Sequence, residues 1–165
     1  MLINTFPDNN QYFKDGVEFL LGELQEEVID TDYCLFVLID RFSIGRLISE
    51  RIVDLTFHDR VFLLTHEKYL PLALYYINTF PGKVNLLSKK TIKKNGATFH
   101  YLTTSLDHSP GILPITPGEY DALEISLNDI MNCSPFKIKK RKTFYCQRWV
   151  ALQKMGLRKI NTLLI

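Results

Sequence analysis

The chain has 165 residues, with 46% hydrophobic and 12% aromatic side chains and 20 Lys+Arg against 18 Asp+Glu. This composition excludes intrinsic disorder and suits one ordinary domain or two small ones, with a core that needs no disulfide. The three cysteines form no C-x-x-C pair and the four histidines lack metal-ligand spacing, so we expect reduced, mostly buried thiols, no structural metal and no cofactor. The longest apolar run covers residues 33–39, whereas a membrane span needs about 20 residues. Because residues 1–8 carry no secretion signal, we expect a cytoplasmic protein without membrane attachment.

Charge is distributed unevenly along the chain. Residues 1–113 hold 11 basic and 14 acidic side chains, whereas residues 114–165 hold nine basic and four acidic ones. From Phe136 onward every charged side chain is basic, and Tyr145 and Trp149 lie among them. Such a stretch is typical of a surface that contacts the phosphate backbone of nucleic acid, and equally of a solvated cationic helix face.

Strands and helices are predicted to alternate over the first half of the chain. Continuous apolar runs of strand length alternate with segments whose apolar residues recur at helical spacing. The predicted order is strand 2–6, helix 10–24, strand 34–39, helix 44–55, strand 60–64, helix 69–76 and strand 84–87. This alternation indicates an α/β fold with a mostly parallel sheet that helices cover on both faces. A further helix is predicted at residues 98–106.

The last third of the chain carries helix signals. Thr116–Glu119 has the pattern of a capping box, with Thr as N-cap, Pro at the first helical position and Glu at the third. Ser134-Pro135 offers a second helix start and Gly156 a C-terminal stop, so helical structure is expected between them, with or without a break. The predicted division is an α/β domain at 1–107, a linker at 108–114 and a small all-α domain at 115–165.

Polar side chains follow the ends of the predicted strands. They are Asp8, Asp40, Thr65 and Lys89. Because the carboxyl ends of parallel strands meet at one edge of a sheet, we expect these side chains to lie close together. Two carboxylates can hold a magnesium ion, and a hydroxyl and an ammonium can contact a phosphoryl group on an aspartate. The same residue types also serve simply to cap strands or to form ion pairs.

Four segments around these residues resemble, in order, the phospho-acceptor site of a response-regulator receiver domain. Residues 8–21 are similar to the family's acidic pair and first helix, 36–40 to the phosphorylated strand, 61–65 to the switch-hydroxyl strand, and 82–89 to the segment ending in a lysine. Asn9 replaces the second acid of the pair, and Leu86 stands where many receivers have an aromatic residue. The resemblance implies an abbreviated, degenerate receiver that works without phosphorylation or a bound metal.

The tail resembles the helix-turn-helix of LuxR/FixJ-type transcription factors. Residues 115–125 are similar to the opening helix of that family, and residues 142–157 to its recognition helix with a hydrophobe-Gly-hydrophobe end. The segment between them is slightly shorter than in the family, and Pro135 falls where the scaffold helix is expected. Capping signals alone also allow one long helix from Pro135 to Met155, which would still expose a basic face.

The resemblance implies that the recognition helix enters the major groove with its N-terminal side chains nearest the DNA. Lys142 and Arg148 suit phosphates or guanine edges, Gln147 can reach a base, and Thr143 is similar to the family's phosphate-contacting hydroxyl. The expected DNA contacts are Lys139, Lys140, Arg141, Lys142, Thr143, Tyr145, Gln147 and Arg148. The large apolar residues of the tail are expected in its core. They are Leu123, Trp149, Val150, Leu152 and Met155.

Together these features predict a DNA-binding transcriptional regulator. We expect it to bind double-stranded DNA as a dimer, with itself or with another LuxR/FixJ-type response regulator as partner. An alternative is an interaction protein that titrates a partner regulator without reading DNA. An enzyme is not expected, because Asp40 is followed by Arg41 and Phe42 instead of a second carboxylate two positions on, and no Gly-rich phosphate loop is present.

Overall fold

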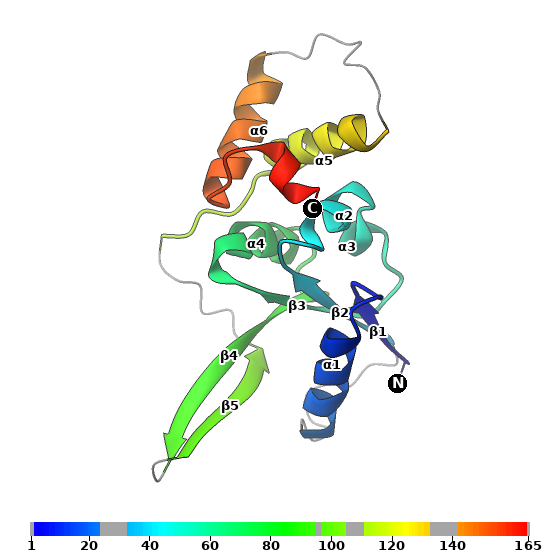
Figure 1. Ribbon diagram of the computed structural model, residues 1–165, viewed down its shortest axis with the longest axis vertical. Helices are drawn as coiled ribbons and strands as arrows, with labels where there is room; N and C mark the ends of the chain where they lie inside the picture. The colour runs from blue at the N-terminus through cyan, green and yellow to red at the C-terminus, as the bar shows by residue number, and fades with distance from the viewer. Residues whose placement is uncertain (1, 24–32, 95–96, 105–110, 133–141, 165) are drawn as a thin grey trace.

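The structure is a computed structural model that describes residues 2–23, 33–94, 97–104, 111–132 and 142–164 (Figure 1). Its strands are β1 (Leu2–Phe6), β2 (Tyr33–Ile39), β3 (Arg60–Thr65), β4 (Val84–Lys94) and β5 (Ala97–Thr104). Its α-helices are α1 (Gln11–Glu23), α2 (Ile44–Ser49), α3 (Ile52–Leu55), α4 (Leu70–Thr79), α5 (Pro117–Met131) and α6 (Lys142–Lys154). Two short 3-10 helices complete it, η1 (Glu67–Tyr69) and η2 (Ile160–Leu163). Among the described residues, no helix combines the length and apolar character that crossing a bilayer needs.

The strands form one sheet in the order β1-β2-β3-β4-β5. The first four are parallel, which confirms the predicted α/β fold with a mostly parallel sheet. A receiver has the doubly wound order 2-1-3-4-5, so the position of β1 at an edge of this sheet differs from that order. Since the parallel strands follow one another in chain order, crossovers of a single hand would put every helix on one face.

Helices cover both faces of the sheet, as predicted. Successive side chains of β2 point to opposite faces and join two different cores. Leu35, Val37 and Ile39 join the larger core, which includes residues of α2, α3 and α4. Cys34 and Phe36 join a smaller core with Val17 of α1. The connection through α1 therefore has the opposite hand to the two connections that follow it, and α1 lies on its own face (Figure 1).

The helix predicted at residues 98–106 is wrong, because β5 pairs antiparallel with β4 from Leu87↔Thr104 to Lys94↔Ala97. The strand predicted at 84–87 is correspondingly too short, since β4 continues to Lys94. Threonines and aromatic residues dominate β5 and favour a strand, and the sequence Asn95-Gly96 between the two strands is the strongest short hairpin signal. β3 pairs with β4 only from Val84 to Leu87, so the rest of the hairpin projects from the sheet as a two-stranded ribbon (Figure 1).

The larger core continues across the predicted linker into the C-terminal helices. Tyr120, Leu123 and Leu127 of α5 and Leu152 and Met155 at the end of α6 belong to the same cluster as the helices that cover the sheet. The backbone N–H of Ile115 also donates to the carbonyl oxygen of Pro71, at the start of α4, at 3.0 Å. The division at 108–114 stays a prediction, and the described residues on either side of it share one core.

Gly45 of α2 lets the C-terminal residues pack directly on this layer. A Cβ atom built on Gly45 would lie 1.8 Å from the carbonyl oxygen of Leu163 in η2. Leu163 itself is buried at 2% exposure. The absence of a side chain at position 45 is therefore what allows backbone to approach backbone here.

A chain of hydroxyl groups crosses the boundary between α4 and α5. The Tyr120 hydroxyl donates to Asp54 Oδ2 at 3.0 Å, and it lies 3.1 Å from the Tyr76 hydroxyl, which is then the donor to Tyr120. The rings of Tyr75 and Tyr120 stack with their centroids 4.4 Å apart. Burial raises the pKa of Tyr76 and of Tyr120 above the ordinary value, so both hydroxyls keep their protons.

His58 connects the edge strand β1 to the loop before β3. Its Nε2 accepts from Asn4 Nδ2 at 2.8 Å, and its Nδ1 faces Thr56 Oγ1. Burial, together with the nearby Lys83 ammonium, lowers the pKa of His58 below 6.5. An imidazole that accepts at Nε2 must be neutral, so the contact with Asn4 and the direction of the pKa agree.

We expect Tyr120→Phe to destabilise the fold by about 1–3 kcal/mol, because it leaves the buried Tyr76 hydroxyl without its acceptor. Tyr76→Phe is the matched control. It removes a donor at the end of the chain and keeps the bond from Tyr120 to Asp54, so its cost is expected to be smaller. Urea denaturation measures both, and equal costs would contradict the direction of the hydroxyl chain.

The pKa of His58 predicts a dependence of stability on pH. Because the folded-state pKa lies below the unfolded value of 6.5, the unfolded chain binds the proton more readily. This contribution is fully present above the unfolded value and is lost as the pH falls below it. In His58→Gln, whose amide can still accept from Asn4, we expect a shallower loss of unfolding free energy between about pH 7 and about pH 5.5. Identical slopes in the two proteins would contradict the assignment.

Candidate nucleic-acid interface

α6 is the described part of the predicted DNA-binding element. It begins at Lys142, and at its other end the N–H of Leu157 donates to the carbonyl of Leu152 at 2.8 Å. The N–H of Gly156 donates to the carbonyl of Gln153 at 2.9 Å, and Gly156 has a φ of 61°. This pair of bonds is a Schellman cap, so the predicted stop at Gly156 is confirmed. The alternative of one helix starting at Pro135 falls on residues 133–141, which lie outside the described ranges.

The predicted capping box of α5 is also confirmed. The Thr116 hydroxyl accepts from the Glu119 N–H at 3.4 Å, and Glu119 Oε2 accepts from the Thr116 N–H at 2.9 Å. Thr116 has an extended backbone and Pro117 follows it as the first helical residue. The two reciprocal bonds satisfy N–H groups that the start of a helix leaves without helical partners.

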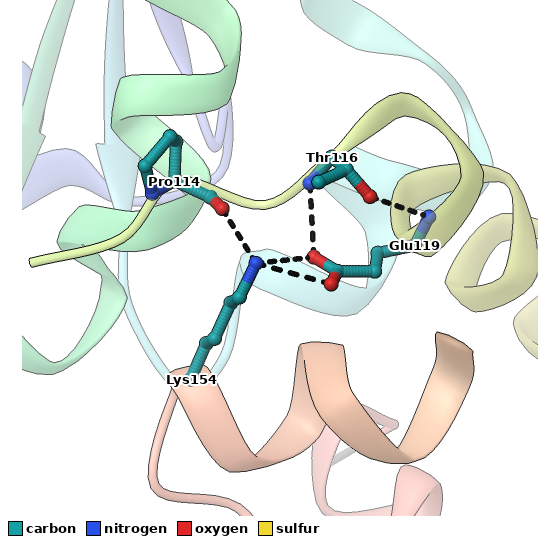
Figure 2. Close-up of polar contacts among 4 residues, drawn as sticks. All are labelled: Pro114, Thr116, Glu119 and Lys154. Carbon is teal, nitrogen blue, oxygen red and sulfur yellow. Dashed lines mark hydrogen bonds and ion pairs between the residues drawn. The ribbon is translucent and has the colours of Figure 1, made fainter. Parts of the chain in front are cut away.

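Lys154 joins the end of α6 to the start of α5 (Figure 2). Its ammonium donates to both carboxylate oxygens of Glu119, at 3.0 and 2.8 Å, and to the carbonyl oxygen of Pro114 at 2.7 Å. The two side chains are only 17% and 9% exposed. All three donors of the ammonium therefore have protein acceptors, which offsets the cost of removing both charges from water.

One face of α6 packs against α5, and the other side chains of the helix are exposed or half-buried. Leu152 and Met155 are buried, and so is Leu123 on α5, as the sequence predicts. Val150 is half-buried. The prediction that Trp149 lies in the core is wrong, since its side chain is 60% exposed. Helical spacing places Trp149 at the flank of the packed stripe, and Leu152 occupies the core position next to it.

The predicted DNA contacts differ in how accessible they are. Lys142, Thr143 and Tyr145 are exposed in the first turns of α6. Gln147 is half-buried, and its side chain lies where a Cβ on Gly118 of α5 would be, with Nε2 at 2.5 Å from that position. Gln147 therefore packs between the helices. Lys139, Lys140 and Arg141 lie outside the described residues.

Arg148 is half-buried and has partners on both helices. Its Nη1 lies 3.5 Å from the Oγ of Ser126 on α5, and its guanidinium carbon lies 5.3 Å from the centre of the Tyr145 ring. Ser126 is fully buried. The guanidinium is thus oriented by α5, and it remains accessible along the flank of α6.

Asp8, the first of the predicted strand-end residues, forms an ion pair with an arginine. Asp8 Oδ1 is 2.9 Å from Arg46 Nη1, and this bond lowers the pKa of the Asp8 carboxyl. Arg46 also binds Glu50 at 2.9 Å, and its guanidinium carbon lies 5.2 Å from the centre of the Phe6 ring. Arg46 thus forms an ion pair with the carboxylate that the predicted magnesium site would use as a ligand. Arg46 was not predicted, although its spacing of four residues from Glu50 marks it as an ion-pair partner.

Asp40 follows directly after Ile39, which pairs with Thr65, so both residues lie at the same edge of the sheet. Asp40 Oδ1 accepts from the N–H groups of Phe42 and Ser43, at 2.9 and 2.8 Å, just before α2 begins. The Thr65 hydroxyl donates to the carbonyl of Ile39 at 3.1 Å. Asp40 therefore stabilises the turn that leads into α2, and Thr65 links the ends of β3 and β2.

Lys89 does not follow a strand end, which corrects the prediction. It lies within β4 and pairs with Leu102 of β5, because the hairpin extends the strand past Leu87. Among the residues that the structure describes, no three His, Cys, Asp or Glu side chains group in a way that could hold a metal ion.

Comparison of the chain with protein-family models, with curated proteins and with solved structures finds no match to any of them.

We expect Lys154→Met to cost about 3 kcal/mol of unfolding free energy, because it leaves the Glu119 carboxylate buried without its cation. Urea denaturation followed by circular dichroism measures this. The double variant Glu119→Gln/Lys154→Met is the control, since glutamine keeps the capping box and carries no charge. It is expected to be more stable than Lys154→Met alone, and a double variant that is less stable would contradict the role of the ion pair.

Proposed function

We propose that this protein is a transcriptional regulator that binds double-stranded DNA through the first half of α6. The observation that carries the proposal is the division of that helix into two parts. Its last turn is anchored by Leu152 and the Lys154 ion pair, and Met155 directly after it is buried. Lys142 and Tyr145 in its first turns are exposed. A helix held in this way can enter the major groove with its N-terminal side chains leading.

The chemistry of the exposed turns supports this role. Lys142 supplies a cation for phosphate, Thr143 a hydroxyl for phosphate or base, and Tyr145 a phenol that lies under the Arg148 guanidinium. The sequence adds Lys139, Lys140 and Arg141 immediately before the helix. Such a concentration of basic groups provides the sequence-independent part of DNA affinity.

The α/β part of the chain is proposed to be a receiver-like regulatory unit that acts without phosphorylation. Support comes from Asp8, whose carboxylate is paired with Arg46, and from Asp40, whose Oδ1 accepts from the N–H groups of Phe42 and Ser43 in the turn before α2. These two carboxylates thus have structural roles that need no phosphoryl group. Regulation would then come from dimerisation, with a second copy or with a LuxR/FixJ-type response regulator, and not from aspartyl phosphate.

A second candidate function is partner titration without DNA reading. It is favoured by exposed aromatic side chains on the α/β part, where Tyr12 and Phe19 lie two turns apart on α1 at 92% and 67% exposure. Phe57, in the loop before β3, is 99% exposed. Large exposed aromatic groups are typical of protein interaction surfaces. The two candidate functions differ in whether α6 contacts DNA.

We expect Lys142→Glu to weaken binding of duplex DNA for every sequence tested and to reduce the log-log salt slope by about 0.9. Fluorescence anisotropy of labelled duplex across a salt series measures both quantities, with and without a conventional LuxR/FixJ-type response regulator. Lys14→Glu, on the exposed face of α1, is the matched charge control. If Lys142→Glu and Lys14→Glu behave alike, alone and in the mixture, the DNA proposal fails and partner titration replaces it.

A further inference from the structure

A hollow of about 300 Å³ lies beside the second half of α6, between that helix and the residues that follow it. Leu152 and Ile160 supply apolar surface, and Asn161 supplies an amide. The volume is at the lower end of the range of small-molecule pockets, about 300–1,000 Å³. The hollow therefore suits one compact ligand.

Three cationic side chains line this hollow, namely Arg148, Arg158 and Lys159, and no acidic side chain does. Arg158 and Lys159 are exposed. Within the described ranges, none of the three forms an ion pair with a carboxylate. Converging cations without counter-charges attract an anion, and guanidinium groups match the geometry of phosphate oxygens.

Trp149 lines the same hollow with its side chain 60% exposed. It is the only tryptophan in the chain. An exposed indole next to cations is suited to stack on a nucleobase whose phosphate the cations hold. The neighbouring Arg148 is oriented by Ser126 and Tyr145, so one of the cations is already positioned before any ligand binds.

We infer that this hollow binds a free nucleotide, with its phosphates on the three cations and its base against Trp149. Duplex DNA could offer a phosphate to the cations of this hollow but no base to Trp149, because its bases are stacked inside the double helix. A single strand is bound by several aromatic platforms along a groove, whereas one ring borders this hollow. The inference goes beyond the proposed function, because nucleotide binding at this site requires no DNA.

The fluorescence of Trp149 provides the test on the full-length chain without DNA. ADP is titrated with excitation at the red edge of tryptophan absorption, next to adenosine, which lacks phosphate, and pyrophosphate, which lacks a base. We expect saturable quenching by ADP, and at least about tenfold weaker binding of adenosine and of pyrophosphate. Arg158→Glu/Lys159→Glu is expected to weaken ADP binding by at least about tenfold. Lys14→Glu/Arg41→Glu makes the same change of net charge outside the hollow and is expected to bind ADP like the wild type.

Trp149→Ala is measured by equilibrium dialysis with labelled ADP, where a loss of about tenfold is expected from the missing stacking. Circular dichroism verifies that each variant is folded. Absence of saturable ADP binding overturns the inference, as does pyrophosphate binding as tight as that of ADP, or an unchanged affinity in the double variant. A single-stranded dA oligomer that displaces ADP at a tenfold lower nucleotide concentration also overturns it, because the site then belongs to a strand. Since no duplex is present, none of these results depends on the DNA proposal.

Discussion

The ion pair between Glu119 and Lys154 is the constraint on which the C-terminal part of the structure depends. One carboxylate caps the first turn of α5 through the Thr116 N–H and also receives the ammonium at the end of α6. The same ammonium binds the carbonyl of Pro114, so the chain leading into α5 is held at the same place. Two segments distant in sequence, the start of α5 with the residues before it and the end of α6, thus meet at one lysine. The orientation of α6 follows from that meeting.

This constraint acts together with the packing of the C-terminal helices on the α/β part. Tyr120 reaches Tyr76 and Asp54, and Gly45 admits the backbone of Leu163. Both contacts involve the face of the sheet covered by α2, α3 and α4, so α6 is supported by the whole larger core. A surface built on such support can keep its cations in a fixed arrangement, which is what recognition of phosphate requires.

Local signals in the sequence were sufficient where the structure depends on neighbours along the chain. The capping box at Thr116, the stop at Gly156 and the alternation of buried strands with helices are all of this kind. The errors arose where distant segments decide. The helix predicted at residues 98–106 is wrong because the local pattern does not show that β4 continues past Leu87 and pairs with this segment. The core position predicted for Trp149 is wrong because helical spacing does not say which flank a neighbouring segment covers.

The candidate site shows the same division. Lys142 and Tyr145, which the sequence predicts as DNA contacts, are both exposed. The pairing of Asp8 with Arg46 and of Glu119 with Lys154 joins residues 38 and 35 positions apart, and no local pattern specifies such partners. The pocket beside Trp149 likewise depends on how the residues after α6 fold back along it.

The projecting ribbon of β4 and β5 has a consequence for the order in which the molecule opens. Beyond Leu87 its strands pair only with each other, while β2 and β3 are paired on both sides and buried between two cores. Backbone bonds in the ribbon can break without disturbing any helix, so its amide hydrogens exchange with solvent through a local fluctuation. Those in the central strands exchange only when the larger core itself comes apart. The β4 strand is therefore divided at Leu87 into a part that opens with the larger core and a part that opens by itself.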